Sequence, residues 1–282
     1  MDGMAEADPI NVVITGASSG LGGEIALCYA RRGARLALFA RRREKLDEVA
    51  RQCLEAGAVE ARVVVGDTTD QSRVAEAIAE LVGAWGRIDR AYLNAGGSGD
   101  RFKAKREEHF LQCCSGDDLT AANFSAESTE WIVRLNYLGV VYWMAPLLGQ
   151  MRRQRAGTIA VTGSLAADGN LPRSGPYTAT KVALRALMDG LRWDARKMGV
   201  RLCLIECGWF ISELTDPKAR APFVMTTDAA ARRAVAGVEA GRRTLRFPWR
   251  MAVLSRLGTF VPRVIRDWFW DRMLPPIAAS GG

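Results

Sequence analysis

The sequence predicts an α/β fold with a doubly wound parallel sheet, and three observations carry this prediction. A β-branched segment at residues 10–15 runs directly into a glycine-rich turn at residues 16–22. A helical pattern of apolar residues follows the turn and stops at Gly33, after which residues 35–40 supply a second apolar strand. Strand and helix patterns then alternate as far as Glu206, which is typical of a parallel sheet with helices on both faces.

The remaining elements follow from the same apolar periodicity. Helices are predicted at residues 43–55, 72–82, 130–153 and 177–198, and strands at residues 61–65, 88–94, 157–162 and 201–206. Since no repeat and no linker separates them, a single Rossmann-type domain over residues 10–240 is expected after a short tail at residues 1–9. A polar insert at residues 97–122 and an Arg/Trp-rich, helical C-terminal extension at residues 241–282 are expected to be attached to this domain.

The composition limits the chemistry that the chain can perform. The chain has 282 residues, of which 49% are hydrophobic, so it can bury a sizeable core. Its single histidine, His109, excludes sites that need two imidazoles, and its six cysteines form no C-x-x-C pair. No metal site is therefore expected. The cysteine pattern instead predicts a reduced, cytoplasmic protein. The acidic first nine residues do not resemble a secretory signal, and no apolar run approaches the ~20 residues of a membrane-spanning helix.

The glycine-rich turn at residues 16–22 predicts a nucleotide-binding site. It places backbone N–H groups at the start of a helix, where the helix dipole favours a pyrophosphate, and glycine admits the phosphate without a Cβ in the way. Its spacing is G-x-x-x-G-x-G, and a glycine-rich turn in isolation is more often only a turn. The position between a strand and a helix is what favours the nucleotide-binding interpretation.

A second candidate group consists of Ser164, Tyr177 and Lys181. Tyr177 and Lys181 are four residues apart on a predicted helix, so a phenol and an ammonium lie on one face. Ser164 follows the preceding strand, 13 positions before Tyr177. Taken alone, the Tyr–Lys pair is also compatible with a packed tyrosine beside a solvated lysine.

In combination, these residues resemble the short-chain dehydrogenase/reductase family over residues 11–214. The family's T-G-x-x-x-G-x-G turn is matched by Thr15, Gly16, Gly20 and Gly22, its Y-x-x-x-K by Tyr177 and Lys181, its serine by Ser164 and its helical asparagine by Asn136. The resemblance implies that Asn136, Ser164, Tyr177 and Lys181 are catalytic. It implies cofactor contacts from Thr15, Gly16, Ser18, Ser19, Gly20, Leu21, Gly22, Asp67, Asn94, Ala95, Gly96, Tyr177, Lys181, Gly208, Ile211 and Ser212.

Two positions depart from the pattern of that family. Leu93 stands where the family usually has the first asparagine of Asn-Asn-Ala-Gly, which is expected to cost a structural hydrogen bond and to leave catalysis intact. Cys207 stands where the family usually has the proline of Pro-Gly after the sixth strand, and the loss of proline frees the local φ angle. Because of this second departure, the nicotinamide pocket expected around Ile211 and Ser212 matches the family pattern less closely than the glycine-rich turn does.

The reaction that the resemblance implies is the interconversion of a carbonyl and an alcohol by hydride transfer. Tyr177 would donate the proton to the carbonyl oxygen. Its unperturbed phenol pKa of ~10 lies about three units above neutrality, and Lys181 would provide much of the lowering, together with the positive ring of the oxidised cofactor. Ser164 would donate a hydrogen bond to the substrate oxygen, while Asn136 would hold a water that connects Lys181 to solvent.

The end of the second strand indicates NADP(H) as the cofactor. An NAD-preferring enzyme places Asp or Glu there, whereas this chain has Ala40 followed by Arg41 and Arg42. A guanidinium binds a 2′-phosphate through paired, charge-assisted hydrogen bonds, and Arg41 is the first candidate for this contact. The alternative is that these arginines only begin a solvated helix.

The sequence also leaves functions other than catalysis open. A protein of this fold can bind the cofactor as a sensor or scaffold, although the complete set of Ser164, Tyr177 and Lys181 argues against this. Nucleic-acid binding through the arginines after residue 241 is not expected, because Trp and Leu are interleaved with them at helical spacings. A homodimer or homotetramer is expected from the resemblance.

The C-terminal extension carries an apolar stripe at helical spacing. Its members are Val261, Val264, Ile265, Trp268 and Phe269. Three roles are open for this segment: a wall over the substrate cleft, a subunit interface, or shallow contact of residues 249–274 with an anionic membrane. A wall over the cleft would favour a hydrophobic substrate, such as a lipid-like or steroid-like ketone or a long aldehyde.

The insert at residues 100–116 has three possible roles as well: a surface loop, a lid or a contact with a partner.

Overall fold

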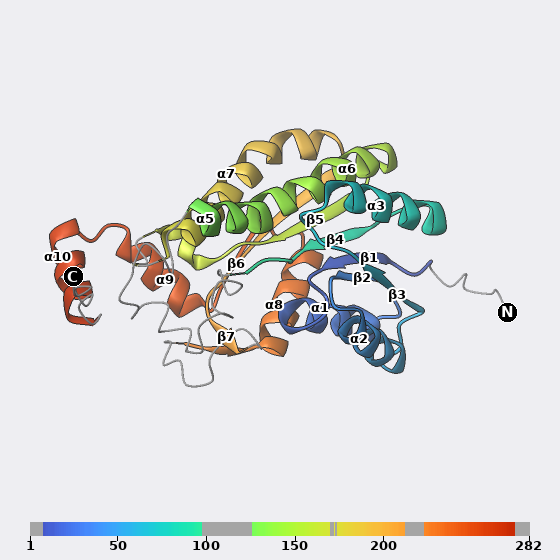
Figure 1. Cartoon of the computed structure of the whole chain (residues 1–282), viewed down its shortest axis with the longest axis horizontal. Helices are drawn as coiled ribbons and strands as arrows, with labels where there is room; N and C mark the ends of the chain where they lie inside the picture. The colour runs from blue at the N-terminus through green and yellow to red at the C-terminus, as the bar shows by residue number, and fades with distance from the viewer. Residues whose placement is uncertain (1–7, 98–125, 170–171, 173, 212–222, 274–282) are drawn as a thin grey trace.

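The computed structural model describes residues 8–97, 126–169, 172, 174–211 and 223–273. Its main feature is a seven-stranded parallel sheet in the order β3-β2-β1-β4-β5-β6-β9 (Figure 1). The strands are β1 (Asn11–Thr15), β2 (Arg35–Ala40), β3 (Glu60–Val65), β4 (Arg90–Leu93), β5 (Gly157–Thr162), β6 (Val200–Cys207) and β9 (Thr244–Phe247). The strand order reverses between β1 and β4, and a doubly wound sheet binds its ligands at the carboxyl ends of the strands on either side of such a reversal.

Helices cover both faces of the sheet (Figure 1). One face carries α1 (Gly20–Ala30), α2 (Arg43–Glu55) and α8 (Thr227–Glu239). The other face carries α3 (Gln71–Trp85), α6 (Gly139–Gln154) and α7 (Gly175–Lys197). The helix α5 (Ala126–Val133) leads into α6 through a π-helical turn at Arg134–Leu138. The predicted doubly wound α/β fold is confirmed.

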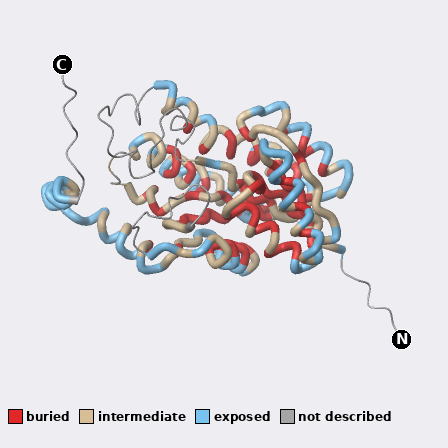
Figure 2. The backbone as a smooth tube through the Cα atoms, turned by 60° about the horizontal axis from the view of Figure 1, so that its bottom comes forward, coloured by how far each residue is buried: buried red, intermediate tan, exposed pale blue. Residues whose placement is uncertain are grey.

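The core forms two apolar layers, one on each side of the sheet. Figure 2 shows the buried residues concentrated in the middle of the molecule. Successive residues of β1 alternate between the two layers, because Val12 belongs to the layer that includes α1 whereas Val13 belongs to the layer that includes α3, α6 and α7. Trp143 of α6 is fully buried, and its ring meets that of Phe39 edge to face at 4.8 Å between centroids. The helical stretch 126–154 is long enough to cross a membrane and contains an 18-residue window with a mean hydropathy of 1.2, but α6 uses its apolar side to cover this sheet.

The expected elements are present with ends that differ by a few residues. The long helix predicted at residues 130–153 starts four residues earlier, at Ala126, and contains the π-helical turn. The expected boundary at residue 240 precedes the last strand, since β9 pairs with β6 from Leu204↔Thr244 to Cys207↔Phe247. The sheet therefore extends to Phe247, and the C-terminal extension consists of α9 (Trp249–Gly258) and α10 (Arg263–Met273).

A small second sheet joins β7 (Phe210–Ile211) to β8 (Met225–Thr226), in parallel. The cysteines within the described ranges, Cys28, Cys53, Cys203 and Cys207, are buried and form no disulfide. Those ranges also contain no group of three or more His, Cys, Asp or Glu side chains that could hold a metal ion.

Candidate active site

The turn after β1 has the shape of a phosphate cradle. Gly16 and Gly20 adopt φ angles of +66° and +59°, which side chains other than glycine rarely tolerate. A Cβ at Gly22 would lie 2.4 Å from the carbonyl oxygen of Gly16, and one at Gly16 would lie 2.9 Å from Ala95 Cα. The Ser19 side chain does not cap α1, so the first N–H groups of this helix point to the turn without that competitor. The turn fits a pyrophosphate at the helix N-terminus.

Thr15 joins this turn to the end of β4. Its hydroxyl oxygen accepts hydrogen bonds from the backbone N–H groups of Asn94 at 2.9 Å and Ala95 at 3.0 Å. The Asn94 side-chain oxygen in turn accepts a hydrogen bond of 3.0 Å from the Thr162 hydroxyl at the end of β5. The ends of three neighbouring strands are thus tied together, although Leu93 supplies no polar side chain there.

Ser164, Tyr177 and Lys181 meet at the carboxyl end of β5. Ser164 lies two residues beyond β5 and caps the 3₁₀ turn Leu165–Asp168, where its Oγ accepts the N–H of Ala166 at 3.1 Å. Tyr177 and Lys181 occupy successive turns at the start of α7, and the side chain of Ser164 is hydrogen-bonded to that of Tyr177. Lys181 Nζ donates to the carbonyl oxygen of Thr162 at 3.0 Å and lies 5.6 Å from the centre of the Tyr177 ring.

Burial dominates the protonation of this group. It raises the pKa of Tyr177 to about 12, against the effect of the hydrogen bond with Ser164, and it lowers the pKa of Lys181 to about 8. The Cys207 thiol, whose pKa burial raises to about 11, interacts with both groups and donates to the Gly163 carbonyl at 3.7 Å. Without a bound cofactor the phenol is therefore not acidified, and its lowering by Lys181 together with a bound cofactor stays a prediction.

Asn136 ties the end of β4 to α7 from within the π-helical turn. Its Oδ1 accepts the N–H of Gly97 at 2.9 Å, while its Nδ2 donates to the Gly97 carbonyl at 2.9 Å and to Thr180 Oγ at 3.3 Å. A Cβ at Gly96 would lie 3.0 Å from Asn136 Oδ1 and 3.8 Å from Lys181 Nζ, so Gly96 separates these two side chains. π-helical turns are frequent at functional sites. That Asn136 holds a water for Lys181 stays a prediction.

The two arginines after β2 occupy different places. Arg42 Nη2 donates to Ser18 Oγ at 3.0 Å and to Ser19 Oγ at 2.8 Å, so its guanidinium lies against the glycine-rich turn. Arg41 is largely exposed and lies 3.7 Å from Asp67 Oδ2 at the end of β3. Arg42 is thus the arginine in contact with the glycine-rich turn, whereas the contact of Arg41 with a 2′-phosphate stays a prediction.

The structure describes some of the residues that are expected to contact the nicotinamide. The N–H of Gly208 donates to the Phe247 carbonyl at 2.8 Å, which fixes the end of β6 against β9. Ile211 lies in β7 opposite Thr226. Ser212, the insert from residue 98 to residue 122 and the tail at residues 1–7 lie outside the described residues.

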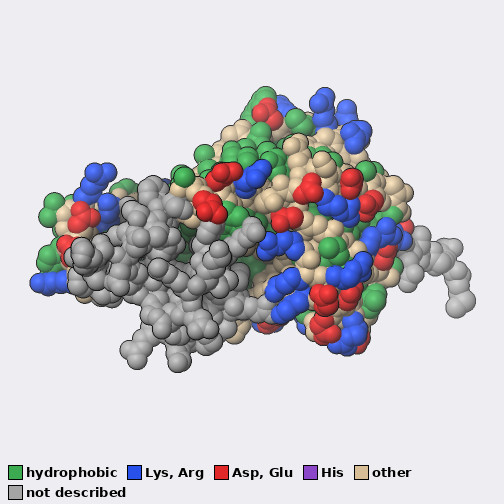
Figure 3. All heavy atoms as spheres, in the orientation of Figure 1, with side chains coloured by type: hydrophobic (Ala, Val, Ile, Leu, Met, Phe, Trp, Pro, Cys, Tyr) green, Lys and Arg blue, Asp and Glu red, His purple; other side chains and the backbone are tan. Residues whose placement is uncertain are grey.

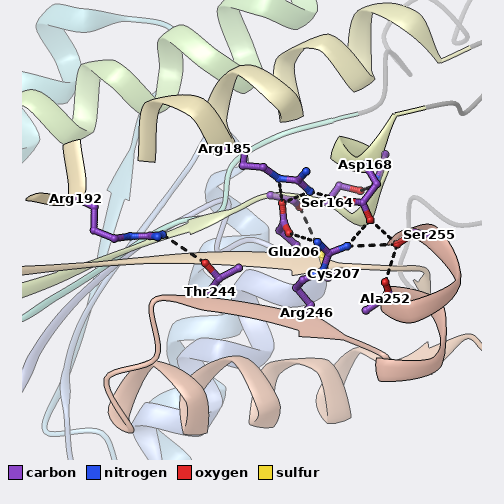
Figure 4. Close-up of polar contacts among 12 residues, drawn as sticks. Ser164, Asp168, Arg185, Arg192, Glu206, Cys207, Thr244, Arg246, Ala252 and Ser255 are labelled. Carbon is purple, nitrogen blue, oxygen red and sulfur yellow. Dashed lines mark hydrogen bonds and ion pairs between the residues drawn. The ribbon is translucent and has the colours of Figure 1, made fainter. Parts of the chain in front are cut away.

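A buried charge network that the sequence reasoning missed lies beside Ser164 (Figure 4). Arg185 reaches it from α7 and donates to Asp168 Oδ1 at 2.9 Å and to Glu206 Oε1 at 2.6 Å. Arg246 reaches it from β9, where it pairs with Asp168 and with Glu206 Oε2 at 3.4 Å. Ser255 of α9 donates to Asp168 Oδ2 at 2.6 Å. The 3₁₀ turn after Ser164 is therefore fixed to α7, β6, β9 and α9.

The two carboxylates of this charge network, Asp168 and Glu206, are almost fully buried and respond differently to their surroundings. Hydrogen bonds from Arg246, Ser255 and Arg185 outweigh burial and lower the pKa of Asp168, whereas burial prevails and raises the pKa of Glu206. Two features of the sequence could have indicated the charge network. Arg185 follows Lys181 by one helical turn, and Glu206 is a charged residue in a strand that is otherwise apolar in this part.

A glycine-rich turn that fits a pyrophosphate and a Ser–Tyr–Lys group lie together at the carboxyl edge of a doubly wound sheet, an arrangement that suits a nucleotide-dependent oxidoreductase. The chain belongs to the short-chain dehydrogenase family, whose model, described as short chain dehydrogenase, matches residues 11–222. It is 31% identical over 269 residues to a hydroxysteroid 11-beta-dehydrogenase 1-like protein of Xenopus tropicalis, covering 93% of this chain and 86% of that one. It is 32% identical to an uncharacterized oxidoreductase of Myxococcus xanthus, covering 94% and 97%.

Solved structures share the fold. A short-chain dehydrogenase from Sphingobium yanoikuyae in complex with NADPH superimposes with a TM-score of 0.71 and 24% identity, covering 90% of this chain and 97% of that one. An alcohol dehydrogenase from Thermococcus sibiricus complexed with 5-hydroxy-NADP gives a TM-score of 0.70 and 24% identity, covering 85% and 96%. The match to the family model and to these relatives confirms the resemblance stated from the sequence motifs.

Proposed function

We propose that the protein is an NADP(H)-dependent oxidoreductase that interconverts a carbonyl and an alcohol on a hydrophobic substrate. The observation that carries this proposal is the placement of Ser164, Tyr177 and Lys181 together at the carboxyl end of β5. The family supports the reaction type, since it consists of dehydrogenases. The Xenopus relative's name, which refers to a hydroxysteroid, is consistent with an apolar substrate.

The cofactor preference follows from the turn and from Arg42. The close approach of Gly16 and Gly22 to neighbouring backbone leaves a surface without side chains, on which the pyrophosphate of a dinucleotide would lie. Arg42 would bind the 2′-phosphate, with Arg41 as a second contact, because Ala40 supplies no carboxylate to repel it. Asp67 would contact the adenine, and Asn94, Ala95 and Gly96 would line the path from adenine to nicotinamide.

The side chains at the end of β5 would handle the substrate oxygen. When bound, the nicotinamide supplies the hydride. Ser164 donates a hydrogen bond to the substrate carbonyl oxygen and holds it, while the Tyr177 hydroxyl transfers its proton to that oxygen as the carbonyl carbon receives the hydride. The products are the alcohol and the Tyr177 phenolate, which regains a proton from solvent. Lys181 stabilises the phenolate as the adjacent cation.

The protonation of Tyr177 favours carbonyl reduction at neutral pH. Because its pKa is about 12, the phenol carries the proton that reduction consumes. Alcohol oxidation needs the phenolate instead, so it is expected to gain more from a rise in pH.

The expected hydrophobic substrate is supported by the surroundings of Gly208. A Cβ placed there would meet Pro248 Cδ at 3.1 Å, Leu165 Cδ1 at 3.3 Å and Met251 Cγ at 3.5 Å. Leu165, which directly follows Ser164, and the start of α9 therefore pack apolar groups around Gly208. This arrangement supports the role of α9 as a wall of the cleft.

The test is a panel of short, long-chain and steroid-like ketones, with NADPH oxidation followed by absorbance. We expect turnover that favours large apolar ketones, and a Tyr177→Phe variant that binds NADPH but loses nearly all activity. Arg42→Ala is expected to weaken NADPH at least tenfold and to leave NADH little changed, since a charge-assisted hydrogen bond contributes about 1.5 to 3 kcal/mol.

Arg43→Ala is the matched control, because Arg43 lies on the exposed side of α2, 3.9 Å from Asp47. Full activity in Tyr177→Phe would refute the mechanism. Equal losses for NADPH and NADH in Arg42→Ala would refute the cofactor assignment. Tight NADPH binding by the native protein with no turnover of any ketone would favour the sensor or scaffold alternative.

A further inference from the structure

The helix α9 packs on the domain with one side and exposes an apolar second side. One side faces the domain, where Ala252 is buried and Ser255 bonds to Asp168. The other side carries Trp249, Val253, Leu254 and Leu257, whose side chains are all at least half exposed. A helix at the surface of a domain needs only one apolar side for packing, so the second side is available for a partner.

The helix α10 continues this exposed apolar surface. Val264, Ile265, Trp268 and Phe269 lie on one side of it, and Val264 is 80% exposed. Among the described elements, none packs along α10, which stands at the end of the molecule away from the sheet (Figures 1 and 2). Helices shorter than ~12 residues are marginal in water on their own, and α10 has 11 residues. A partner surface would stabilise it.

The charges on these two helices distinguish between possible partners. Residues 249–273 contain five arginines and two aspartates, and apolar and arginine side chains lie next to each other on α10 at the left end of Figure 3. The Arg272 guanidinium lies 4.2 Å from the centre of the Trp268 ring, and that of Arg250 lies 5.5 Å from Trp249. A second copy of this surface would bring like charges together, whereas anionic lipid headgroups would pair with the arginines.

We propose that the α9–α10 face, formed by the exposed apolar side chains and arginines of residues 249–273, docks on an anionic phospholipid bilayer. The aromatic and aliphatic side chains enter the boundary between headgroups and acyl chains, and the arginines bind the lipid phosphates. Trp268 and Trp249 suit this depth because an indole has an apolar body and a polar N–H. The combination of apolar burial and charge gives reversible binding to the membrane surface.

Docking would also orient the catalytic cleft. Ser255 and Arg246 hold α9 and β9 to Asp168, at the end of the turn that begins at Ser164 (Figure 4). The helix α9 therefore has a fixed relation to the carboxyl edge of the sheet. A bilayer bound to α9 would therefore lie at a fixed position relative to that edge. The docking itself does not depend on the proposed reaction, because lipid binding can be measured without cofactor or substrate.

The test measures co-sedimentation of the full chain with vesicles of phosphatidylcholine alone and of phosphatidylcholine with 30% phosphatidylglycerol. We expect binding that requires phosphatidylglycerol and weakens as salt is added. The double variant Val264→Ser, Trp268→Ser should bind at least tenfold more weakly, since each removes a large apolar side chain from the contact. Arg263→Gln and Arg272→Gln should each weaken binding about fivefold.

Two matched controls separate docking from general surface effects. Trp193 on α7 is 61% exposed and has Lys197 Nζ 5.3 Å from its ring centre, so Trp193→Ser removes a similar Trp–cation pair elsewhere. Arg152→Gln removes an exposed arginine at the end of α6. Both should bind vesicles like the native chain, and circular dichroism should show that all variants are folded.

Three outcomes would overturn the proposal. The first is absence of binding to the phosphatidylglycerol vesicles. The second is equal binding to both vesicle types, which would exclude the role of the arginines. The third is a dimer in solution that the double variant Val264→Ser, Trp268→Ser converts to a monomer without any effect on vesicle binding, which would assign the face to a second copy of the chain.

Discussion

The buried ammonium of Lys181 is expected to destabilise the cofactor-free protein, and Lys181→Met tests this. Lys181 is only 6% exposed, and its pKa falls from 10.5 to about 8 because burial disfavours the charged form. At pH 7 the ammonium is charged in both the folded and the unfolded chain, and the fold bears the cost of its desolvation. Methionine keeps the apolar stem and removes the charge.

The magnitude follows from the pKa of Lys181 in the two states. A difference between 10.5 and about 8 corresponds to about 3 kcal/mol at pH 7. The variant loses the hydrogen bond from Nζ to the Thr162 carbonyl, which offsets about 1 kcal/mol of this. We therefore expect Lys181→Met to be more stable by about 2 kcal/mol, which is about 5 °C in Tm for a chain of this size, while carbonyl reduction is lost.

The sign of the pH dependence follows from proton binding. Between pH 8 and pH 10.5 the unfolded chain keeps a proton on Lys181 that the folded protein has released. The native protein therefore gains stability as pH rises through this window, and the advantage of the variant shrinks. Below pH 8 the difference between the two proteins is constant.

The assay is thermal unfolding of both proteins without cofactor at pH 7 and pH 10. The control is Lys197→Met, which changes an exposed lysine of the same helix and is expected to have little effect. A Lys181→Met variant that melts below the native protein at pH 7 would refute the reasoning. So would an advantage that stays the same at pH 10.

Three further predictions follow from the same region. Arg246→Met leaves the buried carboxylates of Asp168 and Glu206 with one cation fewer, so chemical denaturation should show a loss of about 3 to 5 kcal/mol; an unchanged midpoint would contradict this. Gly22→Ala places a Cβ 2.4 Å from the Gly16 carbonyl oxygen, and NADPH binding measured by fluorescence titration should be lost while the protein stays folded; native affinity would show that the turn can shift. The rate of carbonyl reduction should fall above pH 8 as Lys181 loses its proton, and Lys181→Arg should move this decline to higher pH if it retains activity; a profile that is flat to pH 10 in the native enzyme would contradict the assignment.

The local sequence determined the layers of the fold and the residues of the candidate site. Apolar residues recur with a period of two in the strands and near 3.6 in the helices, and this periodicity is a property of neighbouring residues. For that reason β1, the glycine-rich turn and α1 are found where they were predicted. The motifs around Ser164, Tyr177 and Lys181 are equally local, and a parallel sheet brings the ends of its strands to one edge.

Other features depend on contacts between distant parts of the chain, and only the tertiary structure decided them. Thr244–Phe247 is too short and too rich in polar residues to be read as a strand, and it becomes one because β6 offers a free edge for pairing. Asp168, Glu206 and Arg246 come from three separate elements, so no spacing in the sequence links them. The choice of Arg42 over Arg41 as the arginine at the phosphate turn depends on side-chain direction at the end of β2. Sequence periodicity specifies which face of an element is buried, whereas the partners of a charged side chain are specified only when the elements are packed together.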